Sequence, residues 1–203
     1  MAQNDGAWSE TALVSIAAQA GTDVKFASIT ETVDIDIGDK DFDVIATLSG
    51  GRLVKFNPQE PTTITLEAYP VDAATEGFTT ATTGAGFFDL MNTYDAAQPL
   101  VVTNDRSRNK HRIAIMWTDS SSETDATAAT VAPTNEALRI VAADGYFTSV
   151  KPSFTDGVLK FTVVYKVPPF DSSGSGNVKI ESVSGSATAT MTALASYTSS
   201  AKW

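Results

Sequence analysis

The most constraining feature of the sequence is an alternation of apolar and polar residues with a period of two. Residues 29–37 and 62–71 show this alternation most clearly. Successive side chains of a β-strand point to opposite faces of a sheet, whereas a helical face repeats about every 3.6 residues. The two segments are therefore predicted to be strands with one buried face and one solvated face. The solvated faces carry the polar residues Asp34, Asp36, Thr63, Thr65 and Glu67.

Short strands separated by turns are predicted through most of the remaining chain. Residues 44–48 and 52–57 flank Gly50 and Gly51, which predicts a hairpin because both glycines tolerate a positive φ. Residues 158–167 have apolar side chains on both faces, which favours a central strand. Other short strands are predicted at 100–103, 113–118, 137–142, 145–150 and 178–183. Roughly nine short strands with little helix predict a mostly β fold, either a sandwich or a barrel.

Two segments are candidates for a short helix. In residues 11–20 one helical face collects Leu13, Ile16, Ala17 and Ala20, although an ordered arm would fit the same residues. Residues 87–93 are compact enough for one or two helical turns. The sequence therefore offers two candidate positions for a short helix beside the strands.

The chain of 203 residues is expected to form a single domain. No linker rich in glycine, proline or serine divides it into two parts. Its less regular parts are predicted to be an N-terminal arm at 1–22, a flexible loop at 119–133 and a C-terminal arm at 184–203. The loop is interpreted as flexible because it contains no residue expected in a core.

Composition excludes several classes of function. The 24 acidic and 14 basic residues give a formal net charge of −10, and an acidic surface repels the phosphate backbone of nucleic acids. There is no cysteine, and His111 is the sole histidine. Disulfides, thiol nucleophiles and metal sites built from cysteine or paired histidines are thereby excluded. No nucleophile motif accompanies His111, so we expect neither an enzyme nor a cofactor.

The sequence predicts neither a membrane span nor a signal peptide. No segment reaches the roughly 20 apolar residues that a membrane-spanning helix needs. The mildly apolar residues 11–20 lack the basic residues that precede the core of a signal peptide, since the first basic residue is Lys25. We expect a soluble protein that is made in a cytoplasm.

An acidic run is the densest charged feature of the sequence. It consists of Asp34, Asp36, Asp39, Asp41 and Asp43. A helix–loop–helix calcium loop starting at Asp39 would need glycine at its sixth position and glutamate at its twelfth. Those positions hold Val44 and Gly50, so we predict no metal site. The run is interpreted as a solvated strand face and turn, or alternatively as the negatively charged wall of a pore.

A basic cluster leads into the predicted strand at 113–118. It consists of Arg106, Arg108, Lys110, His111 and Arg112. One interpretation is a loop that docks on the acidic surface of a neighbouring copy of the chain. The other is an exposed hairpin loop without a partner. Contact with DNA is disfavoured because the cluster lacks interleaved aromatic residues.

Two parts of the chain resemble the tail tube proteins of tailed viruses. The first is SITETVDIDIGDKDFDVIATLSGGRLVKFNPQEPTTITLEAYPVDA at residues 28–73, with its GDKD turn, Gly-Gly-Arg hairpin, Pro-Gln-Glu turn and Tyr-Pro-Val strand end. The second is VVYKVPPFDSSGSGN at residues 163–177. The order and spacing of these elements carry the resemblance, and together they cover under a third of the chain.

The resemblance implies a structural subunit with a β-sandwich or barrel of the tail tube type and one short flanking helix. Six copies would close a ring whose inner strands join into one barrel, and rings would stack into a tube through loops and arms. Viral DNA would pass through the lumen without specific binding. The other partners implied are the tape measure, tail terminator and baseplate or tip proteins. The location implied is the virion tail, assembled in the host cytoplasm.

The resemblance also implies roles for particular residues. Contacts between rings or subunits are expected from Gly38, Asp39, Lys40, Asp41, Gly50, Gly51, Arg52, Arg106, Arg108 and Arg112. The lumen is expected to be lined in part by one of two polar faces, either that of Asp34 and Asp36 or that of Thr63, Thr65 and Glu67. An acidic lumen would offer DNA no cations in exchange for its own counterions.

An alternative with the same strand pattern is an Ig-like or jelly-roll module that binds or decorates a virion or cell surface. Two features weigh against it. Such a secreted module usually carries a signal peptide, and a sugar-binding module usually exposes tryptophan. The three tryptophans here, Trp8, Trp117 and Trp203, are scattered along the chain. A monomer that binds a ligand in solution would favour this alternative.

Overall fold

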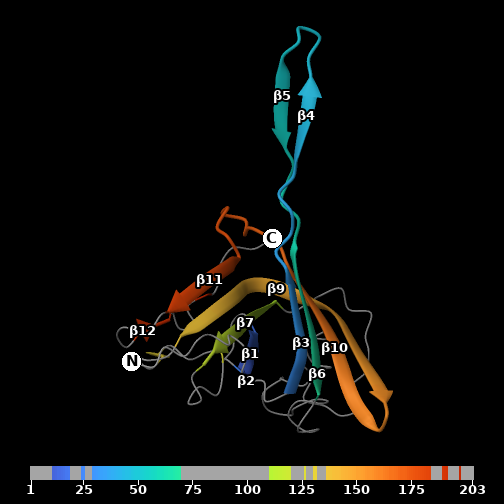
Figure 1. Cartoon of the computed structure of the whole chain (residues 1–203), viewed down its shortest axis with the longest axis vertical. Helices are drawn as coiled ribbons and strands as arrows, with labels where there is room; N and C mark the ends of the chain where they lie inside the picture. Colours follow the sequence, from blue (N-terminus) through green and yellow to red (C-terminus); the bar gives the residue numbers. More distant parts are fainter. Residues whose placement is uncertain are drawn as a thin grey trace.

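A computed structural model shows a mostly β protein (Figure 1), which confirms that part of the predicted fold class. The structure describes residues 11–18, 24–25, 29–69, 110–119, 126, 130–131, 136–183, 189–191 and 197. All the secondary-structure elements within these residues are β-strands. The predicted helical segment at 87–93, the predicted strand at 100–103 and part of each predicted arm lie outside them.

The strands are short, with one exception. In chain order they are β1 (Thr11–Ala18), β2 (Val24–Lys25), β3 (Ile29–Asp36), β4 (Phe42–Ala46), β5 (Arg52–Phe56), β6 (Thr62–Tyr69), β7 (His111–Thr118), β8 (Thr130–Val131), β9 (Ala137–Thr155), β10 (Val158–Val167), β11 (Val178–Val183) and β12 (Ala189–Thr190). The main sheet runs β2-β1-β7-β9-β10-β6-β3, with β11 also paired to β9. All of these pairs are antiparallel.

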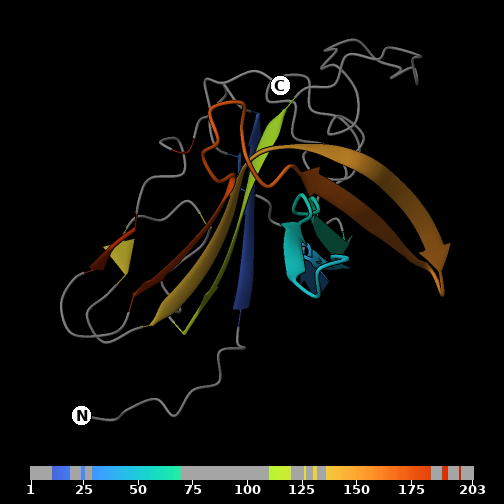
Figure 2. The ribbon, with the colours of Figure 1, turned by 90° about the horizontal axis from the view of Figure 1, so that it is seen from above.

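The long strand β9 divides this sheet into two layers. Residues 137–145 of β9 pair with β7, and residues 137–142 also pair with β11. Residues 146–155 pair with β10. Layer one is defined here as β2, β1, β7, β11 and residues 137–145 of β9. Layer two is residues 146–155 of β9 together with β10, β6 and β3. Figure 2 shows β9 arching from one layer into the other.

The main core lies between the two layers. Layer one contributes buried side chains that include Val14, Ile16, Ile113, Ile115 and Ala142. Layer two contributes buried side chains that include Ile64, Leu66, Phe161, Val163 and Tyr165. A second cluster covers the opposite face of layer one and contains Ala114, Met116, Ala126, Ala137, Val141 and Met191. Because apolar groups cover layer one on both faces, residues 111–116 of β7 are buried without alternation.

The prediction of a helix within residues 11–20 was wrong for the part that the structure describes. Residues 11–18 form β1, which pairs with β7 along its whole length. Val14 and Ile16 enter the main core, whereas Leu13 packs on the second cluster. Short apolar segments fit both periods, and pairing with a central strand decides between them. The predicted N-terminal arm is therefore in part a strand of the sheet.

The predicted strands at 137–142 and 145–150 are one continuous strand. Gly145 lies inside β9 rather than in a turn, where the strand passes from layer one to layer two. A Cβ atom on this glycine would lie 2.5 Å from the ring of Tyr165. The tyrosine hydroxyl donates a 2.8 Å hydrogen bond to the carbonyl of His111. Gly145 is therefore needed for close approach of an aromatic ring, which a sequence pattern does not distinguish from a turn.

The predicted flexible loop at 119–133 contains a buried anchor. Ala126 is fully buried, its N–H donates to the hydroxyl of Ser15 at 3.0 Å, and its carbonyl accepts from Arg139 at 3.1 Å. At the end of the loop, β8 pairs with β12 of the predicted C-terminal arm. The expectation that this loop contributes nothing to a core needs correction. The small side chain of Ala126 joins the second cluster because hydrogen bonds of its backbone with Ser15 and Arg139 hold it there.

Tyr165 predicts a loss of stability in alkaline solution. Burial, and to a smaller extent the charge of Asp144, raise the pKa of Tyr165 well above its ordinary value of 10.0. Below that value both folded and unfolded chains hold the proton, so the stabilisation is complete. As pH rises above it, only the unfolded chain releases the proton, and stability falls. The free energy of unfolding measured in urea should therefore fall more steeply above about pH 10 for the wild type than for Tyr165→Phe.

The same variant provides its own control. At neutral pH, Tyr165→Phe loses the hydroxyl that donates to the carbonyls of His111 at 2.8 Å and Ala142 at 3.3 Å, and it should lose about 1 kcal/mol of stability. All other titrating groups are common to the two proteins, so they contribute equally to both pH profiles. Parallel profiles above pH 10 would contradict the prediction.

Candidate assembly surfaces

The β4–β5 hairpin is a continuation of the β3–β6 ribbon beyond the sheet. Hydrogen bonds between the two arms join Glu60 to Asp39 at 3.1 Å and Asn57 to Asp41 at 3.0 Å. Gly38, with a φ of +77°, lies at the root, where a Cβ atom would meet the carbonyl oxygen of Glu60 at 2.4 Å. Figure 1 shows the hairpin projecting from one end of the body, opposite the turn between β9 and β10.

The tip of the hairpin is a tight turn around Gly50. This glycine has a φ of +81°, and its N–H donates to the carbonyl of Thr47 at 3.0 Å. The predicted hairpin with Gly50 and Gly51 at its turn is confirmed. The residues predicted to contact other copies, apart from the basic cluster, are thus on one element. Gly38, Asp39, Lys40 and Asp41 are at its root, and Gly50, Gly51 and Arg52 are at its tip.

Both strands of the hairpin are exposed along their whole length. The structure leaves the large apolar side chains of both strands in solvent. The exposed apolar residues are Phe42, Val44, Ile45, Leu48, Leu53, Val54 and Phe56. These residues were missed as candidates for an interface. Their signal in the sequence is that FDVIA and RLVKF are apolar on both faces, which is typical of a strand covered on both sides.

The residues predicted to line a lumen share one face of layer two. Asp34 is opposite Thr65 and Asp36 is opposite Thr63, while Glu67 continues the same face. The sequence left open whether the β3 set or the β6 set forms such a face, and the register places both sets together. The opposite face of these strands packs into the main core. Layer two therefore has one apolar side and one polar side.

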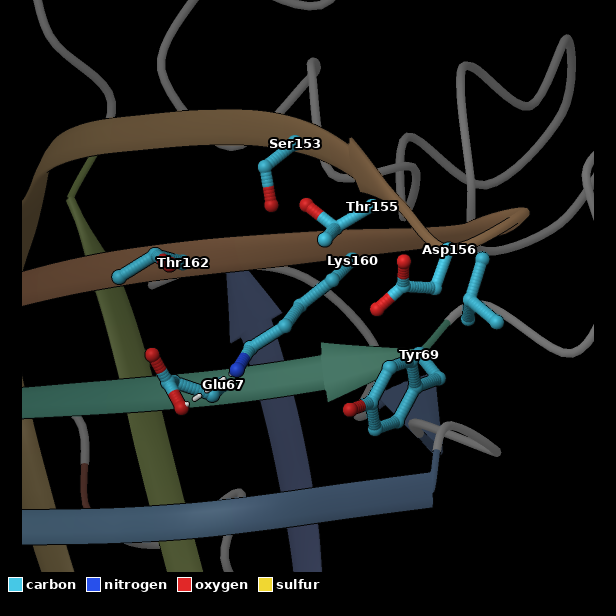
Figure 3. A pocket seen from close by; sticks show the side chains of 8 residues that line it. Glu67, Tyr69, Ser153, Thr155, Asp156, Lys160 and Thr162 are labelled. Carbon is cyan, nitrogen blue, oxygen red and sulfur yellow. Dashed lines mark ion pairs between the residues drawn. The ribbon is translucent and has the colours of Figure 1, made fainter.

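The polar face carries lysines as well as carboxylates, with Asp156 in the turn between β9 and β10 as a fourth acidic group. Strands β9 and β10 add the lysines Lys151, Lys160 and Lys166 to the carboxylates Asp34, Asp36 and Glu67. The Lys160 ammonium lies 2.8 Å from the Glu67 carboxylate and 6.0 Å from the centre of the Tyr69 ring (Figure 3). The expectation of an acidic face on this element thus needs correction, because the lysines come from strands whose pairing the sequence does not reveal.

An open hollow of about 870 Å³ lies on this face near the turn between β9 and β10. Its lining consists of Glu67, Tyr69, Ser153, Thr155, Asp156, Val158, Lys160 and Thr162. Figure 3 shows these side chains rising from β6, β9 and β10 around it. No histidine or cysteine borders the hollow, and the Lys160–Glu67 pair spans its floor.

Both outer edges of layer two lack a partner among the residues that the structure describes. Strand β3 is the last strand of the sheet order and pairs with β6 alone. At the other side, residues 146–155 of β9 pair with β10 alone. Unpaired N–H and C=O groups on an edge strand are ready to pair with another chain. The two edges are of similar length, with eight and ten residues.

The acidic run divides between the polar face and the hairpin. Asp36 accepts a hydrogen bond from the N–H of Gly38 at 3.0 Å, and Asp41 accepts one from Phe42 at 2.7 Å. Asp43 is opposite Lys55 in the hairpin register. Within the described ranges, no group of three histidine, aspartate or glutamate side chains is placed to hold a metal ion. Asp36 and Asp41 thus accept hydrogen bonds from backbone N–H groups at the root of the hairpin.

The basic cluster does not form one exposed loop where the structure describes it. The strand begins at His111, earlier than predicted, and Arg112 is 1% exposed inside β7. Lys110 forms a 3.0 Å ion pair with buried Asp144, and the His111 ring packs edge-on against Phe147. Arg112 was expected to contact another copy at the surface, but it is buried because layer one is covered on both faces. Arg106 and Arg108 lie outside the described residues.

Comparison with solved structures finds similar folds in tube components of injection machines. One is the sheath–tube complex of the extracellular contractile injection system PVC in its extended state, with a TM-score of 0.46, 17% identity and coverage of 85% of this chain and 88% of that chain. The sheath/tube terminator of the same system has a TM-score of 0.46 and 15% identity, over 85% of this chain and 94% of that chain. The tube-terminating cap of the anti-feeding prophage has a TM-score of 0.43 and 12% identity, over 84% of this chain and 88% of that chain.

No protein-family model and no curated protein matches the sequence. The described residues contain no helix that is long and apolar enough to cross a membrane. Because the structural likeness is distant, the proposal that follows rests on the strand edges, the polar face and the hairpin of this chain.

Proposed function

We propose that copies of this chain pair side by side through the two free edges of layer two and close into a ring. The observation that carries the proposal is the direction of the strands. Layer two contains four antiparallel strands in the order β9-β10-β6-β3, so β9 and β3 run in opposite directions. When β3 of one copy lies beside β9 of the next, the antiparallel alternation continues without interruption.

Closure of such a ring explains the two faces of layer two. One face is held against layer one by the main core, so it must look outward from the ring. The polar face then looks into the lumen. With six copies, as the resemblance to tail tube proteins implies, 6 × 4 strands form a barrel of 24 strands. Closure also removes the exposed edges, which are otherwise sites of aggregation.

The function proposed is that of a tail tube subunit of a virion. Rings stack through the projecting hairpins into a tube, which conducts viral DNA into the host. Asp34, Asp36, Thr63, Thr65 and Glu67 line the lumen, beside the three lysines of the same face. The proposed partners are further copies of the chain and the tape measure, terminator and baseplate or tip proteins. Assembly takes place in the host cytoplasm, and the protein acts without enzymatic activity.

Electron microscopy of the purified protein tests this function directly. Negative staining over a range of protein and salt concentrations is expected to show rings with sixfold symmetry and hollow tubes. A starter complex of the neighbouring tail proteins should be included, because stacking can require a first ring. A monodisperse monomer under all these conditions, with starter present, would contradict the proposal and favour a monomeric binding module.

Reversal of two lumen charges should make the tube retain DNA. In Asp34→Lys/Asp36→Lys the polar face changes from four acidic and three basic groups to two acidic and five basic groups. Lysines that neutralise phosphates release counterions from DNA, so retention should increase and should weaken with added salt. The measurement is the retention of fluorescent duplex DNA by sedimented tubes at several salt concentrations.

The matched control places two lysines elsewhere. Ser172→Lys/Ser182→Lys adds basic groups at exposed positions outside the polar face. This control should retain as little DNA as the wild type if the tubes are intact. Equal retention by the two variants would place Asp34 and Asp36 outside the lumen.

A further inference from the structure

The β4–β5 hairpin is apolar on both of its faces. Side chains at alternate positions share a face, and residues directly opposite in the register do so as well. One face carries the cross-strand pairs Phe42–Phe56 and Val44–Val54, and the two phenyl rings lie 6.3 Å apart. The other face carries the pairs Asp43–Lys55 and Ile45–Leu53. Val44 and Ile45 are neighbours in sequence on opposite faces, and they are 53% and 47% exposed.

This pattern differs from that of the ribbon from which the hairpin rises. In β6, buried apolar residues alternate with half-buried polar ones, as expected for a sheet covered on one side. The hairpin has no comparable polar face. A single flat partner would cover one set of apolar side chains and leave the other set in water. Two partner surfaces, one on each face, are needed to cover both sets.

The charges of the hairpin permit burial on both faces. Among the four cross-strand pairs from Phe42–Phe56 to Ile45–Leu53, one is charged. It consists of Asp43 and Lys55, which are directly opposite each other. A cross-strand pair of opposite charge is favourable and leaves no uncompensated charge when it is covered. The remaining charged groups are at the root, outside the two apolar sets, or at the tip, where Arg52 is opposite Ala46.

The position of the hairpin indicates which surfaces cover it. It rises from β3 and β6, and β3 is a free edge of layer two. In the proposed ring that edge borders the seam between two copies. At the opposite end of layer two, Phe154 near the end of the free edge β9 and Val158 at the start of β10 are 72% and 48% exposed. At a seam end in the next ring two copies of the chain therefore meet, and one of them contributes Phe154 and Val158.

We propose that each hairpin is clamped between two neighbouring copies of the chain in the next ring, with one copy against each face. The inference rests on the proposed function, since it requires stacked rings. Each hairpin then joins three copies instead of two. Such a contact fixes the rotation of one ring relative to the next, because only a seam provides two walls.

The absence of cysteine allows a direct test of the two faces. Val44→Cys and Ile45→Cys each provide one thiol for a small environment-sensitive fluorophore. Labelled chains are mixed as a minor fraction with wild-type chains, and quenching by iodide is measured before and after tube assembly. The expected result is a several-fold drop in the quenching constant at both positions. Protection at one position, with monomer-like quenching at the other, would overturn the proposal.

Unlabelled variants provide a second measurement in case labelled chains do not enter tubes. Val44→Thr and Ile45→Thr add a hydroxyl group to opposite faces without a large change in size. Each variant should raise the protein concentration needed for tubes by roughly tenfold, whereas an effect of only one would overturn the clamp. A wild-type protein that never assembles would instead remove the proposed function and the clamp with it, so the two failures are distinguishable.

Discussion

Removal of the β4–β5 hairpin is expected to abolish tube assembly while leaving the melting temperature of the body unchanged. The change replaces residues 39–60 by Asn-Gly, a two-residue turn suited to joining β3 and β6. The apolar side chains removed are about half exposed or more, so little burial within the chain is lost. An isolated two-stranded ribbon also contributes little stability of its own.

The effect on assembly should be large because the hairpin is the main apolar projection of the described chain. We expect the protein concentration needed for tubes to rise by at least about 100-fold, as judged by sedimentation and electron microscopy. Ser49→Ala at the tip keeps the ribbon intact and serves as the control. Tubes of the shortened chain at the wild-type concentration would mean that rings stack through other segments. Single rings that persist without stacking would support separate roles for the strand edges and the hairpin.

Replacement of Arg139 by methionine is expected to produce the largest loss of stability. Arg139 is fully buried, and its Nε and Nη2 donate to the Glu181 carboxylate at 3.0 and 2.5 Å. Its Nη1 donates to the carbonyl of Ala126, and its Cζ lies 5.9 Å from the centre of the Tyr197 ring. Tyr197 in turn donates to the second oxygen of Glu181.

Removal of the guanidinium leaves a partly buried carboxylate and a buried carbonyl without this donor. Breaking such a pair from one side costs about 3 to 5 kcal/mol. In a chain of this size that corresponds to a fall in melting temperature of roughly 10 °C, measurable by calorimetry. Arg139→Lys should also be destabilised, because an ammonium group does not reproduce the fork of donors.

A double variant separates the ion pair from simple packing. Arg139→Met/Glu181→Met removes both charges, so it should be less destabilised than Arg139→Met alone. A single variant that melts like the wild type would show that water satisfies the Glu181 carboxylate. Losses that simply add would show that the two residues act independently.

Strands β3 and β6 of layer two could be predicted from the sequence because each has one buried face and one solvated face. The two-residue period of β3 and β6 identified both strands and the residues on their polar face. The register between them was not predictable, since alternation says which face is buried and not which residue is opposite. The lysines of β9 and β10 reach this face through the pairing of β10 with β6 and of β9 with β10, which the sequence does not reveal, so the charge balance of the face was missed.

Three other features depended on contacts distant in sequence. Residues 11–18 fit a helix and a strand equally well, and pairing with β7 decided between them. The burial of Arg112 and Arg139 could not be predicted, because an arginine indicates a surface unless its partner is known. Ala126 had no signal at all, since its role depends on Ser15 and Arg139 holding its backbone.

The apolar residues of the hairpin were visible in the sequence but not interpretable as exposed. Apolar residues on a strand indicate that a surface will cover them, and they do not say whether it belongs to the same chain. Val44 and Leu53 would look the same in a domain core. Only the structure shows that the described body provides no such surface, which directs attention to other copies.

The continuity of β9 has a mechanical consequence. Layers joined only by side-chain packing can separate one after the other, as in a sandwich whose sheets are connected by loops. Here nineteen residues of one extended backbone run through both layers, so a covalent strand joins the layers in addition to the packing of the main core. Tension applied to one layer is carried to the other along a covalent chain, and the body responds to load as a single cooperative unit.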